Sequence, residues 1–285
     1  MNGILIVDKP AGWTSQDVAA KLRGVLHEKR IGHGGTLDPM ATGVLPVFVG
    51  RATRAVQFFE SAEKEYIAGL RLGVETNTQD IEGEILQTKP PATRDALEAV
   101  LPRFLGAQEQ IPPMFSAIKI GGKKLYELAR QGKEIERQPR AIRIAELELL
   151  GEENGDYLLR VRCSKGTYIR TLCHDIGQAL GCGGCMSSLR RTKAGIYDLA
   201  QSTPLDAIIA SENPEALLLP VDSLFADYPA ITLSGKQEAL CRCGNAIPMQ
   251  GSGFVRVYAQ SGEFLMVGQF SGNSLRTVKS FFEVS

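Results

Sequence analysis

Asp38 is the residue whose surroundings most clearly suit chemistry. It follows the glycine-rich stretch Gly32-His33-Gly34-Gly35-Thr36-Leu37 and precedes Pro39. Glycine permits backbone conformations closed to other residues and lets a ligand approach closely, while Pro39 restricts Asp38 to extended backbone. A carboxylate aimed in this way can attack an electrophilic carbon or remove a proton. An ordinary Asp-Pro turn is the alternative that the dipeptide alone favours.

Other groups that commonly do chemistry are few. Three histidines leave little material for a serine or cysteine triad. The six cysteines are expected to be reduced thiols, because no secretory signal precedes them. Cys182 and Cys185 with Cys241 and Cys243 contain four possible zinc ligands, but the second pair lacks the usual gap of about two to four residues. There is no Walker loop or GxGxxG run. We therefore expect neither a metal centre nor a cofactor.

Strands and helices alternate around the Asp38 loop and must position it. Apolar runs predict strands, and helical periodicity next to capping residues predicts helices. Asn154-Gly155 indicates a hairpin turn. We expect strands at 4–7, 44–49 and 66–72 and within the hairpin 142–162, and helices starting at Ser15 and lying at 52–61, 93–105 and 169–177.

A length of 285 residues suits a large domain followed by a small one. Beyond Pro229, short strands separated by glycine-bearing turns are typical of a small β-barrel. We place the boundary near residue 228, which divides the chain into 1–228, with a basic insertion at about 110–140, and 229–285. No apolar stretch approaches the roughly 18 residues that span a bilayer, and the first apolar run is too short for a signal peptide. We expect a cytoplasmic protein without membrane contact.

Charge is balanced overall but unevenly placed. The chain has 32 basic and 32 acidic side chains. Residues 110–143, the first basic segment, carry eight basic against three acidic side chains, and residues 160–193, the second basic segment, carry seven against one. A solvated surface helix would mix the signs more evenly, so this distribution favours a protein that grips a polyanion on one face.

Several stretches of characteristic sequence occur in order between residues 7 and 192. They are Val7-Asp8-Lys9-Pro10-Ala11-Gly12-Trp13-Thr14-Ser15, the run 32–45, Lys64-Glu65-Tyr66, Thr76-Asn77-Thr78-Gln79-Asp80-Ile81-Glu82-Gly83, Gly166-Thr167-Tyr168-Ile169-Arg170-Thr171-Leu172 and Leu189-Arg190-Arg191-Thr192. In these stretches the chain resembles the TruB-type tRNA pseudouridine synthases, which isomerise the T-loop uridine at tRNA position 55. The resemblance implies an α+β pseudouridine-synthase fold, with a mixed, largely antiparallel central sheet flanked by helices and loops. It also implies a PUA-like RNA-binding barrel at 229–285.

The resemblance assigns catalysis to three residues. Asp38 matches the catalytic aspartate, which attacks the ribose or the base covalently or removes the 2′ proton. Tyr66 matches the tyrosine that stacks on the uracil and is a candidate to take the C5 proton; a tyrosine packed in the core is the alternative. Arg170 matches the arginine that keeps the aspartate ionised and oriented, and a surface ion pair is its alternative.

Four further residues match positions in or near the site. His33 corresponds to the histidine that fills the space left by flipped nucleotides, and Leu189 to the apolar side of the uracil pocket. Lys9 and Asp80 receive binding or scaffold roles. Asn77 departs from the family pattern, which usually has an acidic residue there, and this leaves the role of the Asp80 loop less secure.

RNA binding is assigned to basic side chains. Lys119, Lys123 and Lys124 are interleaved with aromatic residues, as looped RNA requires, and Arg190 is assigned to substrate binding. The partner implied is the T-arm stem-loop of tRNA, for a monomer that needs no obligatory protein partner. Two rivals stay open: a guide-RNA-dependent relative that requires partner proteins, and an RNA-binding module whose catalytic residue is vestigial.

Overall fold

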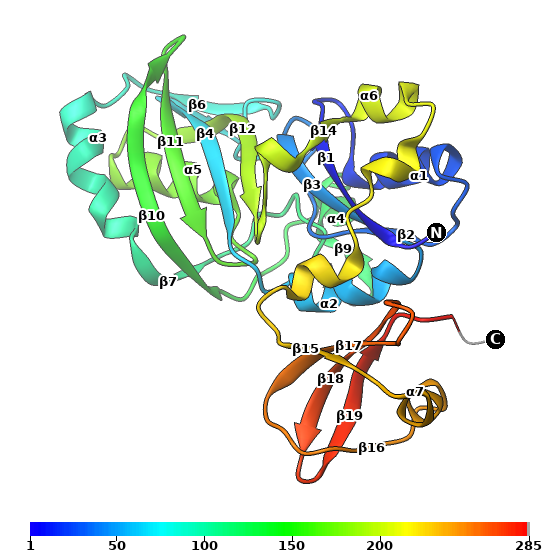
Figure 1. Ribbon diagram of the computed structural model, residues 1–285. Coiled ribbons are helices and arrows are strands. Elements are labelled where there is room, and N and C mark those ends of the chain that lie inside the picture. Colours follow the sequence, from blue (N-terminus) through cyan, green and yellow to red (C-terminus); the bar gives the residue numbers. More distant parts are fainter. Residues whose placement is uncertain (284–285) are drawn as a thin grey trace.

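The protein folds around two β-sheets that lie in separate parts of the molecule (Figure 1). The computed structural model describes residues 1–283. The first sheet contains β1 (Gly3–Lys9), β2 (Ile31–His33), β3 (Thr42–Val49), β4 (Lys64–Leu72), β7 (Gly106–Gln110), β10 (Arg140–Glu153), β11 (Asp156–Cys163), β12 (Gly184–Ala194), β13 (Tyr197–Asp198) and β14 (Thr203–Pro204). The second contains β15 (Ala230–Thr232), β16 (Ile247–Pro248), β17 (Phe254–Tyr258), β18 (Phe264–Ser271) and β19 (Ser274–Ser280).

Helices and two small hairpins complete the described chain. The helices are α1 (Ser15–Val25), α2 (Val56–Phe59), α3 (Arg94–Val100), α4 (Leu125–Ala129), α5 (Ile169–Ala179), α6 (Leu205–Ala210) and α7 (Gly235–Arg242). Short 3-10 turns occupy Gly50–Ala55, Leu101–Phe104, Leu199–Gln201, Pro214–Leu217 and Val221–Phe225. The hairpins are β5 (Val74–Thr76) with β6 (Ile85–Thr88), and β8 (Lys119–Ile120) with β9 (Lys123–Lys124). No described helix is long and apolar enough to cross a membrane.

Strand β12 joins the two halves of the first sheet. The strand order is β14-β1-β3-β12-β4-β11-β10-β7, with β2 added to β3 and β13 to β12. β12 runs parallel to β3 and antiparallel to β4. Gly43 on β3 lies so close to β12 that a Cβ there would come within 2.2 Å of the Arg191 carbonyl oxygen, and its φ is 101°. Only glycine therefore permits this close approach. The expected mixed, largely antiparallel sheet is confirmed.

The central strands are buried because their sequence is apolar along its length. On β3 every residue after Thr42 is buried, and α1 and α5 pack their apolar faces into the main core through residues such as Val18, Leu22, Leu172 and Ile176. The α1 helix begins at Ser15, as predicted, and Thr14 before it is the N-cap, which exchanges hydrogen bonds with Asp17 in a capping box. Ser15 itself is 1% exposed.

Two predicted helices are only partly helical. Residues 52–61 form a 3-10 turn and then the single-turn α2 rather than one continuous helix. The predicted helix 93–105 starts at Arg94 but changes to a 3-10 turn at Leu101. Pro102 accounts for the change at Leu101, because proline has no backbone N–H to continue the α-helical hydrogen-bond ladder. The predicted hairpin turn is present, with left-handed φ at Asn154 and Gly155.

The second sheet has the strand order β15-β17-β18-β19-β16 and a core of its own (Figure 1). The Phe281 ring follows β19 and lies 6.0 Å, between ring centroids, from the Phe225 ring, and this contact connects the second sheet to residues that pack against the first. Cys241 belongs to this small core and Cys182 to the main core, so the two cysteine pairs considered as zinc ligands pack in different places.

Candidate active site

A cavity of about 1070 Å³ opens where the Asp38 loop faces the insertion. The loop contributes residues 33–40 to its wall, and the insertion contributes residues 115–117. The segment 164–168 before α5 closes another side, and Lys64 and Tyr66 of β4 line the cavity with Arg191 of β12. The cavity is thus built from the segments that the sequence analysis singled out.

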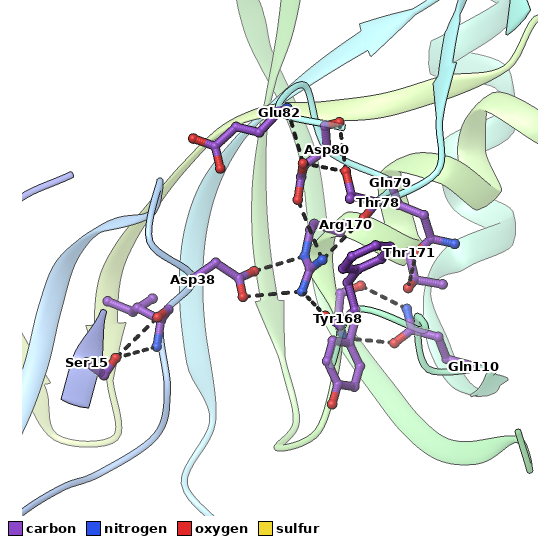
Figure 2. Close-up of polar contacts among 12 residues, drawn as sticks. Ser15, Asp38, Thr78, Gln79, Asp80, Glu82, Gln110, Tyr168, Arg170 and Thr171 are labelled. Carbon is purple, nitrogen blue, oxygen red and sulfur yellow. Dashed lines mark hydrogen bonds and ion pairs between the residues drawn. The ribbon is translucent and has the colours of Figure 1, made fainter. Parts of the chain in front are cut away.

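Asp38 and Arg170 meet at this cavity as a two-pronged ion pair (Figure 2). Arg170 Nε lies 2.9 Å from Asp38 Oδ2, and Arg170 Nη2 donates to Oδ1 at 3.2 Å. The Arg170 side chain is 6% exposed and the Asp38 side chain 35%, so the arginine is held within the protein while the carboxylate faces the cavity. Two parallel contacts fix the direction of a carboxylate as well as its charge.

The remaining donors of Arg170 are also engaged. Nη1 donates to the Thr78 carbonyl oxygen at 3.2 Å and lies 3.5 Å from Asp80 Oδ2, and Nη2 donates to the Phe115 carbonyl oxygen at 2.9 Å. The guanidinium therefore lies between two carboxylates and also contacts the insertion. These contacts hold the guanidinium in one orientation. Because the guanidinium in turn binds both oxygens of Asp38, it holds that carboxylate in one orientation as well.

Asp80 is held by its own turn. Its Oδ1 accepts hydrogen bonds from the Thr78 hydroxyl at 2.7 Å and from the Glu82 N–H at 3.2 Å. Asn77, which departs from the family pattern, closes the same turn by accepting from the Glu84 N–H at 3.0 Å. The substitution at residue 77 thus leaves the pairing of Asp80 with Arg170 in place.

The Asp38 loop is anchored from behind by the connection between β1 and α1. Lys9 is fully buried, and its Nζ donates to the carbonyl oxygens of Pro10, Trp13 and Pro39 at 2.9, 2.6 and 3.2 Å. Ser15 accepts from the Leu37 N–H at 2.8 Å. Burial lowers the pKa of Lys9 to about 8, against a partly opposing effect of the Asp38 charge. Of the two roles considered for Lys9, these contacts fit the scaffold.

Tyr66 lies on β4 with its side chain on the cavity, and the residue is 8% exposed. Its cross-strand neighbour is Arg191, which the sequence analysis did not select. Arg191 is 1% exposed, and its guanidinium donates to the carbonyl oxygens of Val44 at 2.7 Å and Gly35 at 3.2 Å. Burial raises the pKa of the Tyr66 hydroxyl, and the Arg191 charge opposes that rise.

A signal for Arg191 was present in the sequence. Side chains on a strand alternate between faces, so Arg191 shares a face with Leu189, whereas Arg190 lies on the other. Arg190 accordingly points away from the cavity and pairs with Asp8 at 2.8 Å. The two-residue alternation of a strand, applied from Leu189, therefore indicates Arg191 rather than Arg190 as the arginine that lines the cavity.

The other expected site residues divide into two groups. His33 and Lys124 line the cavity with Asp38, Tyr66, Asp80 and Arg170. Burial and then the Arg191 charge lower the pKa of His33, which favours the neutral ring. Lys119 and Lys123 are exposed on the insertion, outside the cavity wall. Leu189 is 8% exposed and packs in the main core, without lining the cavity in this arrangement.

The two basic segments differ in how their charge is used. Within residues 1–283 the first segment has one internal ion pair, between Arg137 and Glu134, and so keeps most of its positive charge. In the second segment four of the seven basic side chains form ion pairs, and those of Arg160 and Arg162 lie exposed at the surface. Its pairs are Arg160 with Glu148, Arg162 with Glu63 and Glu146, Arg170 with Asp38 and Asp80, and Arg190 with Asp8.

Known proteins match this chain along most of its length. A family model described as the N-terminal domain of TruB family pseudouridylate synthases matches residues 23–169, and one described as the C-terminal domain of tRNA pseudouridylate synthase B matches residues 170–226. The chain is 46% identical to tRNA pseudouridine synthase B of Azoarcus sp. strain BH72 over 281 residues, 97% of this chain and 93% of that protein. It is also 46% identical to the protein of that name from Syntrophomonas wolfei over 288 residues, 98% of this chain and 96% of the relative.

Solved structures also match nearly the whole chain, at lower sequence identity. The chain is similar to one in a Cbf5-Nop10-Gar1 complex, with a TM-score of 0.74 and 28% identity over 99% of this chain and 85% of that one. It is similar to a chain in an H/ACA RNP bound to a substrate RNA containing 2′-deoxyuridine, with a TM-score of 0.72 and 26% identity over 99% and 86% of the two chains.

The shared fold, together with an aspartate and an arginine paired at its cavity, defines the class of protein as a pseudouridine synthase. Family models and relatives that span nearly the whole chain narrow this further. The chain belongs to the TruB family. The resemblance inferred from the ordered stretches between residues 7 and 192 is thereby confirmed.

Proposed function

We propose that this enzyme converts the T-loop uridine at position 55 of tRNA to pseudouridine, with Asp38 as its catalytic group. The observation that carries the proposal is the bidentate ion pair of Asp38 with Arg170 at a cavity that Tyr66 also lines. The names of the relatives, tRNA pseudouridine synthase B, support tRNA as the substrate.

The reaction is an isomerisation that a carboxylate can carry. The N1–C1′ bond of the uridine breaks, the base turns, and a C5–C1′ bond forms, while a proton leaves C5 and one is gained at N1. Asp38 either attacks covalently or removes the 2′ proton, and Arg170 keeps its oxygens directed at the sugar. Electrons and atoms balance without an oxidant, so the proposal requires no cofactor.

The substrate base must leave its stack to reach Asp38. Extrusion costs a few kcal/mol, and stacking on an aromatic side chain recovers roughly 1–3 kcal/mol. Tyr66 supplies the ring, and its hydroxyl is our candidate acceptor for the C5 proton. A cavity of about 1070 Å³ holds more than a single base, and His33 on its wall suits the space that flipped nucleotides leave.

RNA binding is proposed for the first basic segment and the second sheet. Lys119, Lys123 and Lys124 keep their charge free of carboxylates within residues 1–283, and the Lys124 Nζ lies 5.3 Å from the centre of the Tyr126 ring. Such interleaving of cations and aromatic rings suits looped RNA. We propose residues 1–228 as the catalytic domain and residues 229–285 as a PUA-like RNA-binding domain.

The enzyme is proposed to act in the cytoplasm as a monomer without a guide RNA or protein partner. Its test is incubation of the purified chain with unmodified tRNA transcript, followed by chemical mapping of pseudouridine and by light scattering. A transcript with cytidine at position 55 is the matched control. Modification at position 55 alone supports the proposal. Modification only after a guide RNA and partner proteins are added, or tight binding without any modification, contradicts it.

A further inference from the structure

The turn between β5 and β6 contains a strained residue that the catalytic account does not use. Gln79 has a φ of 66°, a left-handed conformation that is rare outside glycine, asparagine and aspartate. It lies between Thr78 and Asp80, whose carbonyl oxygen and carboxylate both face Nη1 of Arg170 (Figure 2). Gln79 does not itself line the cavity.

Three hydrogen bonds hold Gln79 in this conformation. Its N–H donates to the Thr76 carbonyl oxygen at 3.2 Å, and its own carbonyl oxygen accepts from the Met186 N–H at 3.0 Å. Its side-chain Oε1 accepts from the Thr171 hydroxyl at 2.7 Å. The first two bonds use only backbone atoms of Gln79, so the third is the one that requires its side chain.

Thr171 connects this turn to the catalytic arginine. It follows Arg170 in the first turn of α5, and it is 3% exposed, so the donor of the bond to Gln79 is buried. One helical turn therefore contacts three consecutive residues of the loop: Arg170 contacts Thr78 and Asp80, and Thr171 contacts Gln79. A left-handed residue turns the chain sharply, which lets the groups on either side of Gln79 converge on one nitrogen.

We propose that Gln79 is a positioning residue for the isomerisation. Its bond with Thr171 keeps the left-handed turn in place, and the turn fixes the Arg170 guanidinium that clasps Asp38. This inference rests on the proposed function, because it concerns the same Asp38 chemistry. Gln79 touches no reacting atom and acts only through Arg170.

The test uses matched variants of the full chain. Thr171→Val removes the hydroxyl and keeps the shape, whereas Thr171→Ser keeps the donor. Thr171→Val is expected to lower kcat about three- to tenfold, the range that one neutral hydrogen bond contributes. We expect KM for tRNA to stay within about twofold, because the turn positions Arg170 rather than RNA, and Thr171→Ser to restore kcat.

A second variant separates the bond from backbone strain and from folding. Gln79→Gly accepts the left-handed φ without strain but loses the bond, on a half-buried turn where substitution leaves the core intact. It should lower kcat as Thr171→Val does, and the double variant should be no slower than either single one, since both remove the same interaction.

Four results overturn the proposal while leaving the proposed function intact, and the first three concern kcat alone. They are a wild-type kcat in Thr171→Val and Gln79→Gly, multiplied losses in the double variant, or an equal loss in Thr171→Ser. A rise in KM without a fall in kcat also contradicts it, because that result assigns the turn to RNA binding. A wild-type protein that forms no pseudouridine in the same assay refutes the proposed function and this inference together.

Discussion

Replacing Arg170 by methionine is expected to slow the reaction far more than it weakens the fold. Methionine keeps an unbranched apolar stem but removes the two interactions of 2.9 and 3.2 Å that direct Asp38. A hydrogen bond to a charged group contributes about 1.5–3 kcal/mol. Because the two contacts between Arg170 and Asp38 form one bidentate interaction, we count this contribution once, and kcat should fall about 10- to 150-fold.

The fold tolerates this change because both carboxylates keep other partners. The Asp38 side chain is 35% exposed, so water replaces the guanidinium there. Asp80 is 10% exposed but still accepts from the Thr78 hydroxyl and the Glu82 N–H. We expect the free energy of unfolding to fall by about 1–3 kcal/mol, the penalty of a poorly satisfied buried group.

The assay is single-turnover release of tritium from tRNA labelled at uridine C5, with urea denaturation of the same samples. The double variant Arg170→Met with Asp80→Asn is the control, because it removes the carboxylate charge left without its cation. It should recover stability while the rate stays low. Arg170→Met with a rate within about twofold of wild type, or a double variant with a restored rate, would refute the reasoning.

Three further predictions concern tRNA binding, the pH dependence of stability and the group that accepts the C5 proton. Replacing Lys123 and Lys124 by glutamine should weaken tRNA binding and lower the slope of log K against log salt by about 0.7–0.9 for each phosphate that the protein no longer neutralises. Arg160→Gln should leave that slope unchanged, because Arg160 is already paired with Glu148, and equal slopes in both variants would place the RNA elsewhere. The pKa of Lys9 is lowered to about 8 from 10.5, so the unfolded chain binds more protons between these values and stability rises with pH. Lys9→Met should reduce that rise in urea titrations, and an unchanged rise would contradict the assignment. Tyr66→Phe keeps the ring but not the hydroxyl, so kcat should fall with little change in KM; an unchanged kcat would exclude the hydroxyl as proton acceptor.

The parts of the site that lie in one segment could be predicted from the sequence. Glycine placement, alternation and helical spacing indicate the Asp38 loop, the strand that carries Tyr66 and the helix start at Arg170, because these signals are local. The Asn154-Gly155 hairpin is predictable for the same reason.

Features that depend on interactions between distant residues could not be predicted in this way. Arg190 pairs with Asp8, 182 residues away, and no local sequence pattern indicates this ion pair. Arg191 reaches the Asp38 loop only because Gly43 lets β12 approach β3. The 3-10 turn at residues 50–55 reflects packing against the start of the chain, where a Cβ on Gly50 would lie 2.0 Å from the Met1 carbonyl oxygen.

The most direct measurement of the central claim is tritium release by Asp38→Asn alongside its affinity for tRNA. Asparagine keeps the size of the side chain and removes its charge, so the cavity and the RNA-binding surface stay as they are. We predict tRNA binding close to that of the wild type and no release of tritium from C5 of uridine 55. Release at the wild-type rate would contradict the assignment of the chemistry to this carboxylate.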